Sequence, residues 1–568
     1  MSTILAAAPV RQRVHWSDRV GHVVLAAIAL ALAAFLAGPL LTILAQSVED
    51  KSGEFAGLEN FIAYFGTPAL LDSLWNSVWT SLAVTAVVLP AAFAYAYALT
   101  RSCMPWKSAF RTITLIPLLA PSLLAAISFI FWFGNQGVLK DWMQALGIAQ
   151  IYGAPGIILS QIFSVFPHAL MILITALSLA DARLYEAADS LGTRRARKFF
   201  TITLPGAKYG LASAAMVTFT LVITDFGIPK VIGGNFNVLA TDVFKLVIGQ
   251  QDFPKGAVVA LVLLAPALLT FALDRIVQHK QTSMLTARAV PYAPKPSRGY
   301  DIAMTAYCAV VTLLMLAVLG MAIFASFVKF WPYDLSFSLR HYVYGIVDGG
   351  VNVAFVNSLK LAFGTAIAGT AIVFAGAYLM EKTRGADWLR PALQLLALLP
   401  MAVPGLVLGL GYIFFFNAPQ NPLNFLYHTM AILVLCTVVH FYTTGHLTAV
   451  TALKGLDAEF ESVSASLKVP FWKTFWRVTL PICTPALVDI SRYFFINAMT
   501  TISAVVFLYS PDTRLVSVTI LNFDEAGEIG AAAAMAILIA AASLAACLAY
   551  LGIGWFVERR TQAWRTSK

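Results

Sequence analysis

Charged residues are scarce in this chain. Only 12% of its 568 residues are Asp, Glu, Lys or Arg, whereas about a quarter is usual in soluble domains. Hydrophobic residues make up 59% of the chain, and the mean hydropathy is +0.79. So little charge excludes an ordinary soluble multidomain protein and indicates a protein embedded in a lipid bilayer.

Residue patterns that carry catalysis or metal binding are also missing. The five cysteines stand singly without a C-x-x-C pair, and the eight histidines are dispersed, so the sequence indicates neither a zinc site nor a disulfide framework. No G-x-x-x-x-G-K-[ST] segment occurs, so the phosphate-binding loop of a P-loop ATPase is absent. No Ser, His, Cys and carboxylate set has catalytic spacing, and we expect no enzyme and no cofactor bound by this chain.

Long apolar runs are abundant. A membrane-spanning helix needs about 20 apolar residues, and twelve runs of this kind are present. They cover residues 22–46, 76–99, 109–133, 156–177, 207–226, 256–277, 302–327, 358–380, 392–416, 430–449, 483–507 and 532–556. The sequence therefore predicts an all-α membrane protein with about twelve transmembrane helices.

The basic residues indicate the orientation in the membrane. Most of the 38 Lys and Arg fall in the segments that share a side with the two chain ends. Because loops rich in Lys and Arg stay in the cytoplasm, we expect a multi-pass protein with both termini cytoplasmic. The same distribution explains the net charge of +10 without nucleic acid, because the basic residues form no single patch or stripe.

One segment is written twice. Residues 175–205 return as residues 451–481, with Thr-Ala-Leu at the start and Thr-Leu-Pro at the end of both copies. Asn76-Ser77 matches Asn357-Ser358, and Pro117 matches Pro400, at nearly the same interval. We expect two six-helix domains in parallel orientation, residues 1–278 and 301–568, forming a pseudo-twofold pair. Residues 279–300, rich in proline and basic residues, are expected to be a cytoplasmic linker.

The first copy of the repeat predicts a helical elbow in the cytoplasm. Asp181 is a candidate N-cap for a short helix that contains Glu186. Gly192 can adopt a positive φ, which lets that helix end and a second one begin at an angle. Pro205 is then expected to start the fifth span as a first-turn proline. Taken alone, the basic run from Arg194 to Lys198 would indicate only a cytoplasmic loop.

The spacing of these residues resembles a known signature. The spacing of the glutamate, glycine and proline resembles the EAA signature of the permease subunits of ABC importers. The residues that carry this resemblance are Glu186, Ala187, Ala188, Gly192, Leu204 and Pro205. The resemblance implies that the elbow docks on a separate ATP-binding subunit. The second copy has Leu467, Leu480 and Pro481 at the matching positions. It has Lys468 where the signature has glycine and Ser462 where it has glutamate, and Glu461 stands one position early. An identical turn in the second half is therefore open to doubt.

The resemblance covers the whole chain and implies its partners. They would be two copies of an ATP-binding subunit, which would hold ATP and magnesium, and a periplasmic or extracytoplasmic substrate-binding protein. The chain would then be the fused permease of an importer in the bacterial inner membrane and work by alternating access. A twelve-helix secondary transporter is the alternative of a different class, but it would leave the elbow unexplained. A membrane-embedded enzyme is a weaker third.

Polar residues within the spans are candidates for the translocation pathway, because such groups are costly in lipid. Thr218 and Asp225 share one face of the fifth span, and the repeat places Asn497 and Thr501 at equivalent positions, with Thr500 beside them. We expect these faces to meet near the pseudo-twofold axis, with the breaks at 225–229 and 509–512 lining a cavity. The alternative is that Asp225 only caps a helix end.

The substrate is indicated by resemblance alone. Residues 224–229 and 498–507 resemble fused permeases that serve ferric iron and 2-aminoethylphosphonate. Residues 249–255 and 508–513 are most similar to the 2-aminoethylphosphonate branch. The resemblance thus implies a small-molecule substrate, 2-aminoethylphosphonate or a related phosphonate, with ferric iron as the alternative.

Overall fold

The computed structural model describes residues 16–284, 292–347, 350–382, 388–457, 459–467 and 469–561. Within these ranges the chain is almost entirely helical, as the composition predicts. The two named strands, β1 (Val328–Phe330) and β2 (Asp334–Phe337), form one short antiparallel hairpin. The expectation of an all-α membrane fold is confirmed.

The helices follow one another in two comparable series. The first comprises α1 (Trp16–Leu32), η1 (Ala33–Ala37), α2 (Gly38–Ser47), α3 (Glu59–Phe65), α4 (Pro68–Arg101), α5 (Lys107–Leu115), η2 (Ile116–Leu119), α6 (Leu123–Phe133), α7 (Lys140–Ala145), α8 (Ala154–Ser178), α9 (Ala182–Ser190), α10 (Arg195–Lys198), η3 (Phe199–Thr203), α11 (Leu204–Ile223), α12 (Gly227–Ile232), α13 (Leu239–Phe244), η4 (Lys245–Gly249) and α14 (Phe253–Met284). The second comprises α15 (Arg298–Phe327), α16 (Arg340–Val347), α17 (Val351–Lys382), α18 (Arg390–Leu398), η5 (Leu399–Ala402), α19 (Gly405–Phe416), η6 (Asn424–Leu426), α20 (Met430–His440), α21 (Tyr442–Lys454), α22 (Glu459–Ser466), α23 (Phe471–Thr474), η7 (Phe475–Thr479), α24 (Leu480–Thr500), η8 (Pro511–Thr513), α25 (Val516–Glu525) and α26 (Ile529–Thr561).

The number of membrane spans is close to the predicted twelve. Eight described helices are long and apolar enough to cross a bilayer, and three sharply bent pairs raise this number to eleven. The remaining predicted run is α24, which has 21 residues. Its hydropathy is lowered by Asp489 and Arg492, whose side chains form an ion pair of 2.9 Å, so that the charges compensate each other within the helix.

Prolines mark two of the bends. The chain turns by 101° between α5–η2 and α6, and by 114° between α18–η5 and α19. Pro117 lies in η2 and Pro400 in η5, at the matched positions of the sequence repeat. Because proline lacks a backbone N–H and its ring clashes with the preceding turn, each of these helices ends in a short 3₁₀ turn and changes direction.

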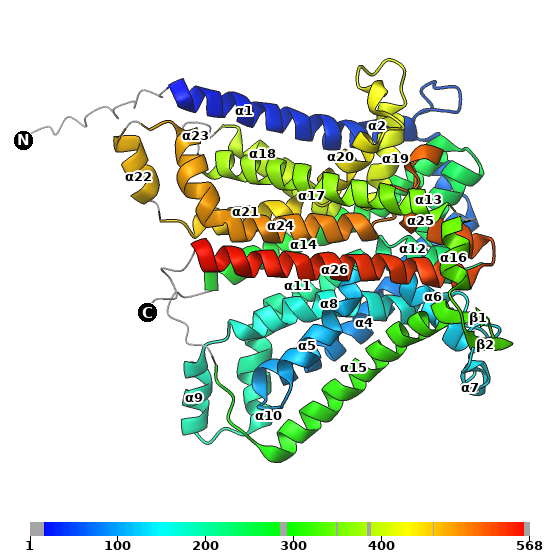
Figure 1. Ribbon diagram of the computed structural model, residues 1–568, viewed down its shortest axis with the longest axis horizontal. Helices are drawn as coiled ribbons and strands as arrows, with labels where there is room; N and C mark the ends of the chain where they lie inside the picture. Colours follow the sequence, from blue (N-terminus) through cyan, green and yellow to red (C-terminus); the bar gives the residue numbers. More distant parts are fainter. Residues whose placement is uncertain are drawn as a thin grey trace, which may run out of the picture.

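The two halves exchange their first helices. The first helix of the chain, α1 with η1 and α2, packs against α17, α18, α19 and α20 of the second half. In return α15, the first helix of the second half, packs against α4, α5 and α6 (Figure 1). The limits 1–278 and 301–568 therefore describe the repeat in the sequence rather than two separate bodies in space.

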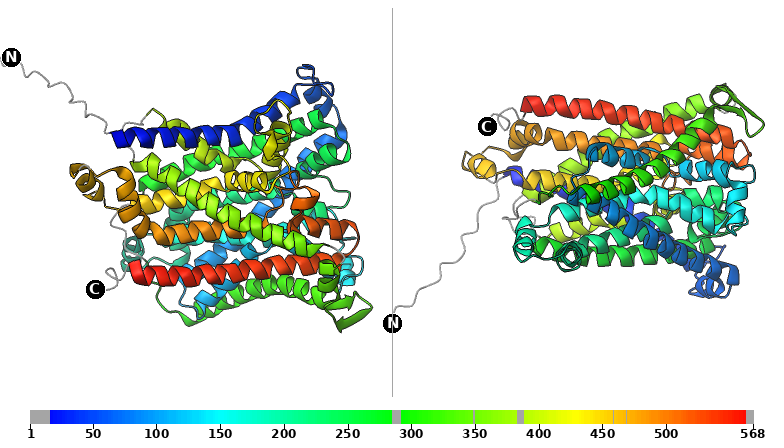
Figure 2. Two further views of the ribbon diagram at one scale, coloured as in Figure 1. Left: turned by 45° about the horizontal axis from the view of Figure 1, so that its top comes forward. Right: turned by 90° about the horizontal axis from the view of Figure 1, so that it is seen from below.

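The molecule has two distinct ends along its long axis. The start of α1, the helix pairs α9–α10 and α22–α23, and the close of α26 lie at one end (Figures 1 and 2). The hairpin of β1 and β2, together with α7, α16 and α25, lies at the other. Both repeated elbow segments thus project from the same end, as a parallel repeat requires.

Candidate coupling site and pathway

The first elbow consists of α9, a glycine turn and α10. The Asp181 carboxylate accepts a hydrogen bond from the Arg183 backbone N–H at 3.1 Å and caps α9. Gly192 has a φ of +65°, and the backbone N–H of Thr193 returns to the carbonyl of Ala188 at 2.9 Å. These contacts confirm the predicted N-cap and the predicted left-handed glycine. The turn that ends α9 requires a positive φ at position 192, a conformation that is strained for residues other than glycine.

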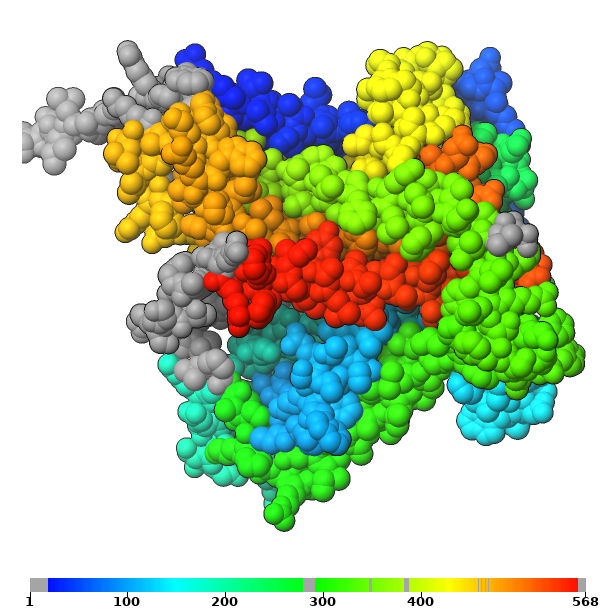
Figure 3. Space-filling view, in the orientation of Figure 1, coloured from blue at the N-terminus to red at the C-terminus, as the bar shows by residue number. Residues whose placement is uncertain are grey.

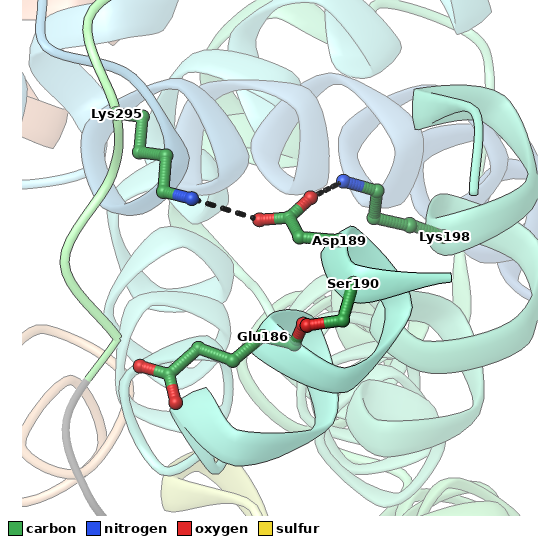
Figure 4. Close-up of polar contacts among 5 residues, drawn as sticks. All are labelled: Glu186, Asp189, Ser190, Lys198 and Lys295. Atoms are coloured by element: carbon green, nitrogen blue, oxygen red, sulfur yellow. Dashed lines mark hydrogen bonds and ion pairs between the residues drawn. The ribbon is translucent and has the colours of Figure 1, made fainter. Parts of the chain in front are cut away.

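Glu186 lies on the open face of α9. Its side chain is exposed, and its carboxylate lies apart from the pairs that Asp189 forms with Lys198 and Lys295 (Figure 4). Ala187 is exposed too, as are Leu184 at 59% and Leu191 at 83%. Among the described residues no basic side chain forms an ion pair with Glu186. The face thus combines one free carboxylate with apolar side chains, a composition suited to binding a partner.

The opposite face of α9 is fixed to the membrane helices. Ala188 and Tyr185 are buried, and the Tyr185 hydroxyl lies 2.9 Å from the Thr203 hydroxyl in η3. The Arg101 guanidinium, at the end of α4, lies 5.2 Å from the centre of the Tyr185 ring. These contacts attach α9 to the end of α4 and to the helix that begins with α10.

Asp189 joins α9 to α10 and to the linker through ion pairs. Its carboxylate pairs with Lys198 of α10 and, at 3.3 Å, with Lys295 of the linker (Figure 4). The hydrogen bonds from Lys198 and Lys295 hold the pKa of the Asp189 carboxyl below its ordinary value. The sequence analysis did not identify Asp189, because its partner Lys295 is distant in the chain and no local pattern joins the two.

The second helix of the elbow differs from the expectation in one respect. Pro205 lies in the first turn of α11, as expected, but α10, η3 and α11 form one continuous helix from Arg195 to Ile223 rather than two separate helices. The turn at Phe199–Thr203 is π-helical, and the Leu204 N–H donates to the Phe199 carbonyl. This wider turn accommodates Pro205, whose ring would clash with the carbonyl of a regular α-helix.

The second elbow has the same order of elements as the first but, among the described residues, lacks the ion pairs that Asp189 forms there. Asp457 caps α22, accepting from the Glu459 N–H at 3.0 Å, and a π-helical turn at Phe475–Thr479 again precedes Leu480 and Pro481. Thr474 stands where the first half has Lys198, and its hydroxyl contacts that of Ser464. Leu467 is exposed at 69%. The side chain of Glu461 and all of Lys468 lie outside the described residues.

The predicted pathway residues do not come together as expected. The helix α11, which carries Thr218, packs mainly against α4, α8 and α14, while α24 packs mainly against α17, α21 and α26. Asp225 accepts from the Ile228 N–H at 3.3 Å and caps α12, the alternative role named above. The helices α11 and α24, which form the fifth span of each half, are each surrounded by helices of their own half. Helix faces that are equivalent in the sequence repeat therefore need not lie opposite each other.

The second-half residues of this set are satisfied within α24. The Asn497 side-chain amide donates to the Tyr493 carbonyl at 2.8 Å, and the Thr500 hydroxyl donates to the Ile496 carbonyl at 3.1 Å. Thr501 is the buried C-cap of the helix, and the hydroxyl of buried Thr218 has no partner in the described part of the chain. A role for these residues in translocation stays a prediction.

The halves do meet around a cavity at the end remote from the elbows. Lys230 of α12 forms an ion pair of 2.7 Å with Glu525 of α25, and the rings of Phe244 and Phe507 stack with centres 6.0 Å apart. A cavity of about 530 Å³ lies beside these contacts, and Tyr509 lines it. Of the two breaks expected to line a cavity, 509–512 contributes Tyr509 to this one, whereas none of residues 225–229 lines it. Sequence reasoning missed the ion pair between Lys230 and Glu525 beside it.

The described residues offer no metal centre. No group of three or more His, Cys, Asp or Glu side chains is close enough to hold a metal ion in the part of the chain that the structure describes. The polar groups of the cavity are instead two ammonium groups, one carboxylate, two side-chain amides and one hydroxyl, which belong to Lys230, Lys245, Glu525, Gln250, Asn522 and Tyr509. Such a mixture can make weak contacts with a substrate that carries both charges.

Comparisons with known proteins agree with this arrangement. The family described as binding-protein-dependent transport system inner membrane component matches the chain twice, over residues 95–283 and 371–562. A ferric transport system permease of Actinobacillus pleuropneumoniae is 28% identical over 88% of this chain and 73% of its own. A provisionally named ferric transport system permease of Haemophilus influenzae is 26% identical over 75% of this chain and 69% of its own. A sulfoquinovosyl glycerol transport system permease of Agrobacterium fabrum is 27% identical over 40% of this chain and 78% of its own.

Proposed function

The chain belongs to the family of binding-protein-dependent transport system inner membrane components, and on this premise we propose that it imports 2-aminoethylphosphonate or a related phosphonate. It is the fused permease subunit of an ABC importer, a multi-pass membrane protein and not an enzyme. The free face of α9 around Glu186 is the observation that supports coupling to a separate ATPase. Two ATP-binding subunits would bind there and at α22, on the cytoplasmic side of the bacterial inner membrane.

The proposed cycle follows from the two ends of the molecule. The elbows lie at separate corners of one end (Figure 3), while Lys230–Glu525 and Phe244–Phe507 join the halves at the other. Closure of the ATPase subunits would draw the elbows together and separate the halves at the remote end. A loaded periplasmic binding protein would deliver its substrate into the cavity there. Both chain termini then lie in the cytoplasm.

The ion pair across the halves provides a test of this cycle. Glu525→Lys places two cations side by side and is expected to lower substrate uptake about threefold, since a partly exposed ion pair contributes up to about 1 kcal/mol. The double exchange Lys230→Glu with Glu525→Lys is expected to restore most of the uptake. Glu528→Lys, an equal change of charge at a nearby exposed position, is the control. A double exchange as impaired as Glu525→Lys alone would contradict a closing role for the pair.

The substrate proposal rests on resemblance and on the cavity. Residues 249–255 and 508–513 resemble the 2-aminoethylphosphonate branch, and Gly249, Gln250 and Tyr509 from these segments line the cavity. A zwitterion with a phosphonate and an ammonium group would find both Lys230 and Glu525 there. Weak contacts with groups of both signs permit both entry and release.

Ferric iron is the second candidate. It is favoured by the printed names of the two relatives that align with most of this chain. Iron in this oxidation state prefers several hard, anionic oxygen ligands, and the described residues show no cluster of this kind. Because a binding protein would select the substrate before delivery, the lack of such a cluster in the permease does not decide between the two.

Uptake measurements distinguish the two candidates. We expect cells that depend on this transporter to accumulate radiolabelled 2-aminoethylphosphonate and to take up ferric iron only at the background rate. The strain should lack other routes for both substrates, and cells without this chain serve as the control. Iron uptake without aminophosphonate uptake would refute the substrate proposal and leave the permease assignment intact.

A further inference from the structure

A basic cavity lies beside the first elbow, where Arg101 and Tyr292 contact Tyr185 of α9. It has a volume of about 420 Å³ and is formed by the end of α4, the start of α5, the end of α8 and the linker residue Tyr292. Arg101, Lys107 and Arg111 line it, and no Asp or Glu does. The volume falls within the range of about 300–1,000 Å³ that is usual for small-ligand sites.

Arg101 is the buried cation of this cavity. Its residue is only 7% exposed, and Nη2 donates to the Leu177 carbonyl at 2.7 Å. Its Nε has no hydrogen-bond acceptor, and no carboxylate among the described residues pairs with the guanidinium. The Tyr292 ring lies over it, with the centre 4.7 Å away. A buried guanidinium without an anion is unfavourable, so the site lacks one negative charge.

Lys107 and Arg111 add two further cations on α5. They lie one helical turn apart on the same face, where like charges repel each other. Neither side chain lies within ion-pair distance of a carboxylate in the described ranges, and Lys107 interacts electrostatically, beyond that distance, with Asp301 of α15. The helix is uncovered on this side of the molecule and is bordered by α15 (Figure 3). An anion held between the three cations would remove this repulsion and neutralise Arg101.

We propose that this cavity binds a phosphate-bearing anion. The group would belong either to the headgroup of an acidic phospholipid or to a soluble phosphate compound, because both present the same oxygens to arginine and lysine. The position suits a headgroup. The helix α4 has 34 residues and at ~1.5 Å per residue is far longer than the ~30 Å hydrocarbon core, so its end lies near headgroup level.

The bound anion would also steady the elbow. Arg101 and Tyr292 both contact Tyr185 on the inner face of α9, and the rings of Tyr185 and Tyr292 are 4.5 Å apart. An anion that holds Arg101 and Tyr292 in place would therefore hold α9 against α4. The second half has Lys382 in the position of Arg101.

Retention of phosphatidylglycerol by the purified full chain tests the proposal. The chain is reconstituted in nanodiscs of phosphatidylcholine with a small fraction of phosphatidylglycerol, and bound lipid is counted by native mass spectrometry after release. We expect Lys107→Gln with Arg111→Gln to weaken phosphatidylglycerol binding at least about tenfold. Arg101 is left unchanged because its loss endangers folding. Lys473→Gln with Arg477→Gln is the matched control, since these exposed cations have the same spacing at the same end of the molecule.

The outcomes separate the sources of the anion. Loss of bound phosphatidylglycerol in the α5 variant but not in the control supports the lipid source. The soluble source is supported by a different result: millimolar inorganic phosphate stabilises the parent chain against heat and stabilises the α5 variant less. In that case phosphatidylglycerol is not selectively retained. Equal lipid binding by the parent and both variants, together with no response to inorganic phosphate, would overturn the proposal. An equal loss in both variants would overturn it too, since it would show attraction to general surface charge.

Discussion

Gly192→Val is expected to reduce uptake by the assembled importer at least about tenfold while the chain still inserts into the membrane. Gly192 has a φ of +65°, and a Cβ added there would meet no atom within 4 Å. The effect must therefore come from the backbone, because a β-branched residue in the left-handed region is strained by about 1–3 kcal/mol. The strain would open the turn between α9 and α10, and ATP hydrolysis would no longer drive transport. Uptake and ATP hydrolysis by the same purified complex measure this uncoupling.

Two other glycines serve as controls for this prediction. At Gly206 an added Cβ also meets nothing within 4 Å, but the backbone is not left-handed, so Gly206→Val should be tolerated. Gly527 has a φ of +78° and the same open surroundings, but it lies outside the elbow, next to α25. Gly527→Val should introduce similar strain without uncoupling ATP hydrolysis from transport. Normal uptake by Gly192→Val would show that the elbow does not depend on this turn.

Glu186→Ala is expected to lower uptake about tenfold, whereas Glu461→Ala should lower it less than about twofold. The carboxylate of Glu186 is free on the open face of α9 (Figure 4), and loss of a charged contact at an interface costs about 2 kcal/mol or more. In the second half Ser462 occupies the position equivalent to Glu186. In the part of the chain that the structure describes, the helix α22 also lacks an ion pair like that of Asp189 with Lys198 in the first half. Uptake should be compared at equal amounts of chain in the membrane.

The matched control for this pair is Glu59→Ala. Glu59 is an exposed carboxylate in α3, away from both elbows, and its loss should leave uptake unchanged. Equal losses for Glu186→Ala and Glu461→Ala would contradict the inference that the first elbow binds its ATPase subunit more strongly than the second.

Local signals in the sequence predicted local structure well. The apolar runs gave the helices, and Asp181 and Gly192 gave the cap and turn of the first elbow. The bends at η2 and η5, within runs that were expected to be single spans, were not predicted, although the repeat had matched Pro117 with Pro400. Each of the predicted features depends on a few neighbouring residues. Backbone conformation and hydrogen bonding within one turn fix them, so their residue types are informative without the rest of the fold.

Features that depend on distant residues could not be predicted. The exchange of first helices between halves and the ion pair of Lys230 with Glu525 join segments far apart in the chain. The same is true of the linker contact between Lys295 and Asp189. The sequence repeat even suggested the wrong contact for α11 and α24, because it shows which helices are equivalent and not which ones touch. The continuous helix through Pro205 was missed since a π-helical turn has no clear signature in composition.

The mass of the complex purified through a tag on this chain tests the central claim most directly. The chain is co-expressed with its ATP-binding subunit, extracted in a mild detergent and analysed by native mass spectrometry. The two elbows at one end of the molecule predict a complex of one copy of this chain with two ATP-binding subunits. A complex with one such subunit would contradict a coupling role for the second elbow. Recovery of this chain alone, still able to transport its substrate in liposomes under an ion gradient without ATP, would contradict the ABC importer mechanism and favour a secondary transporter.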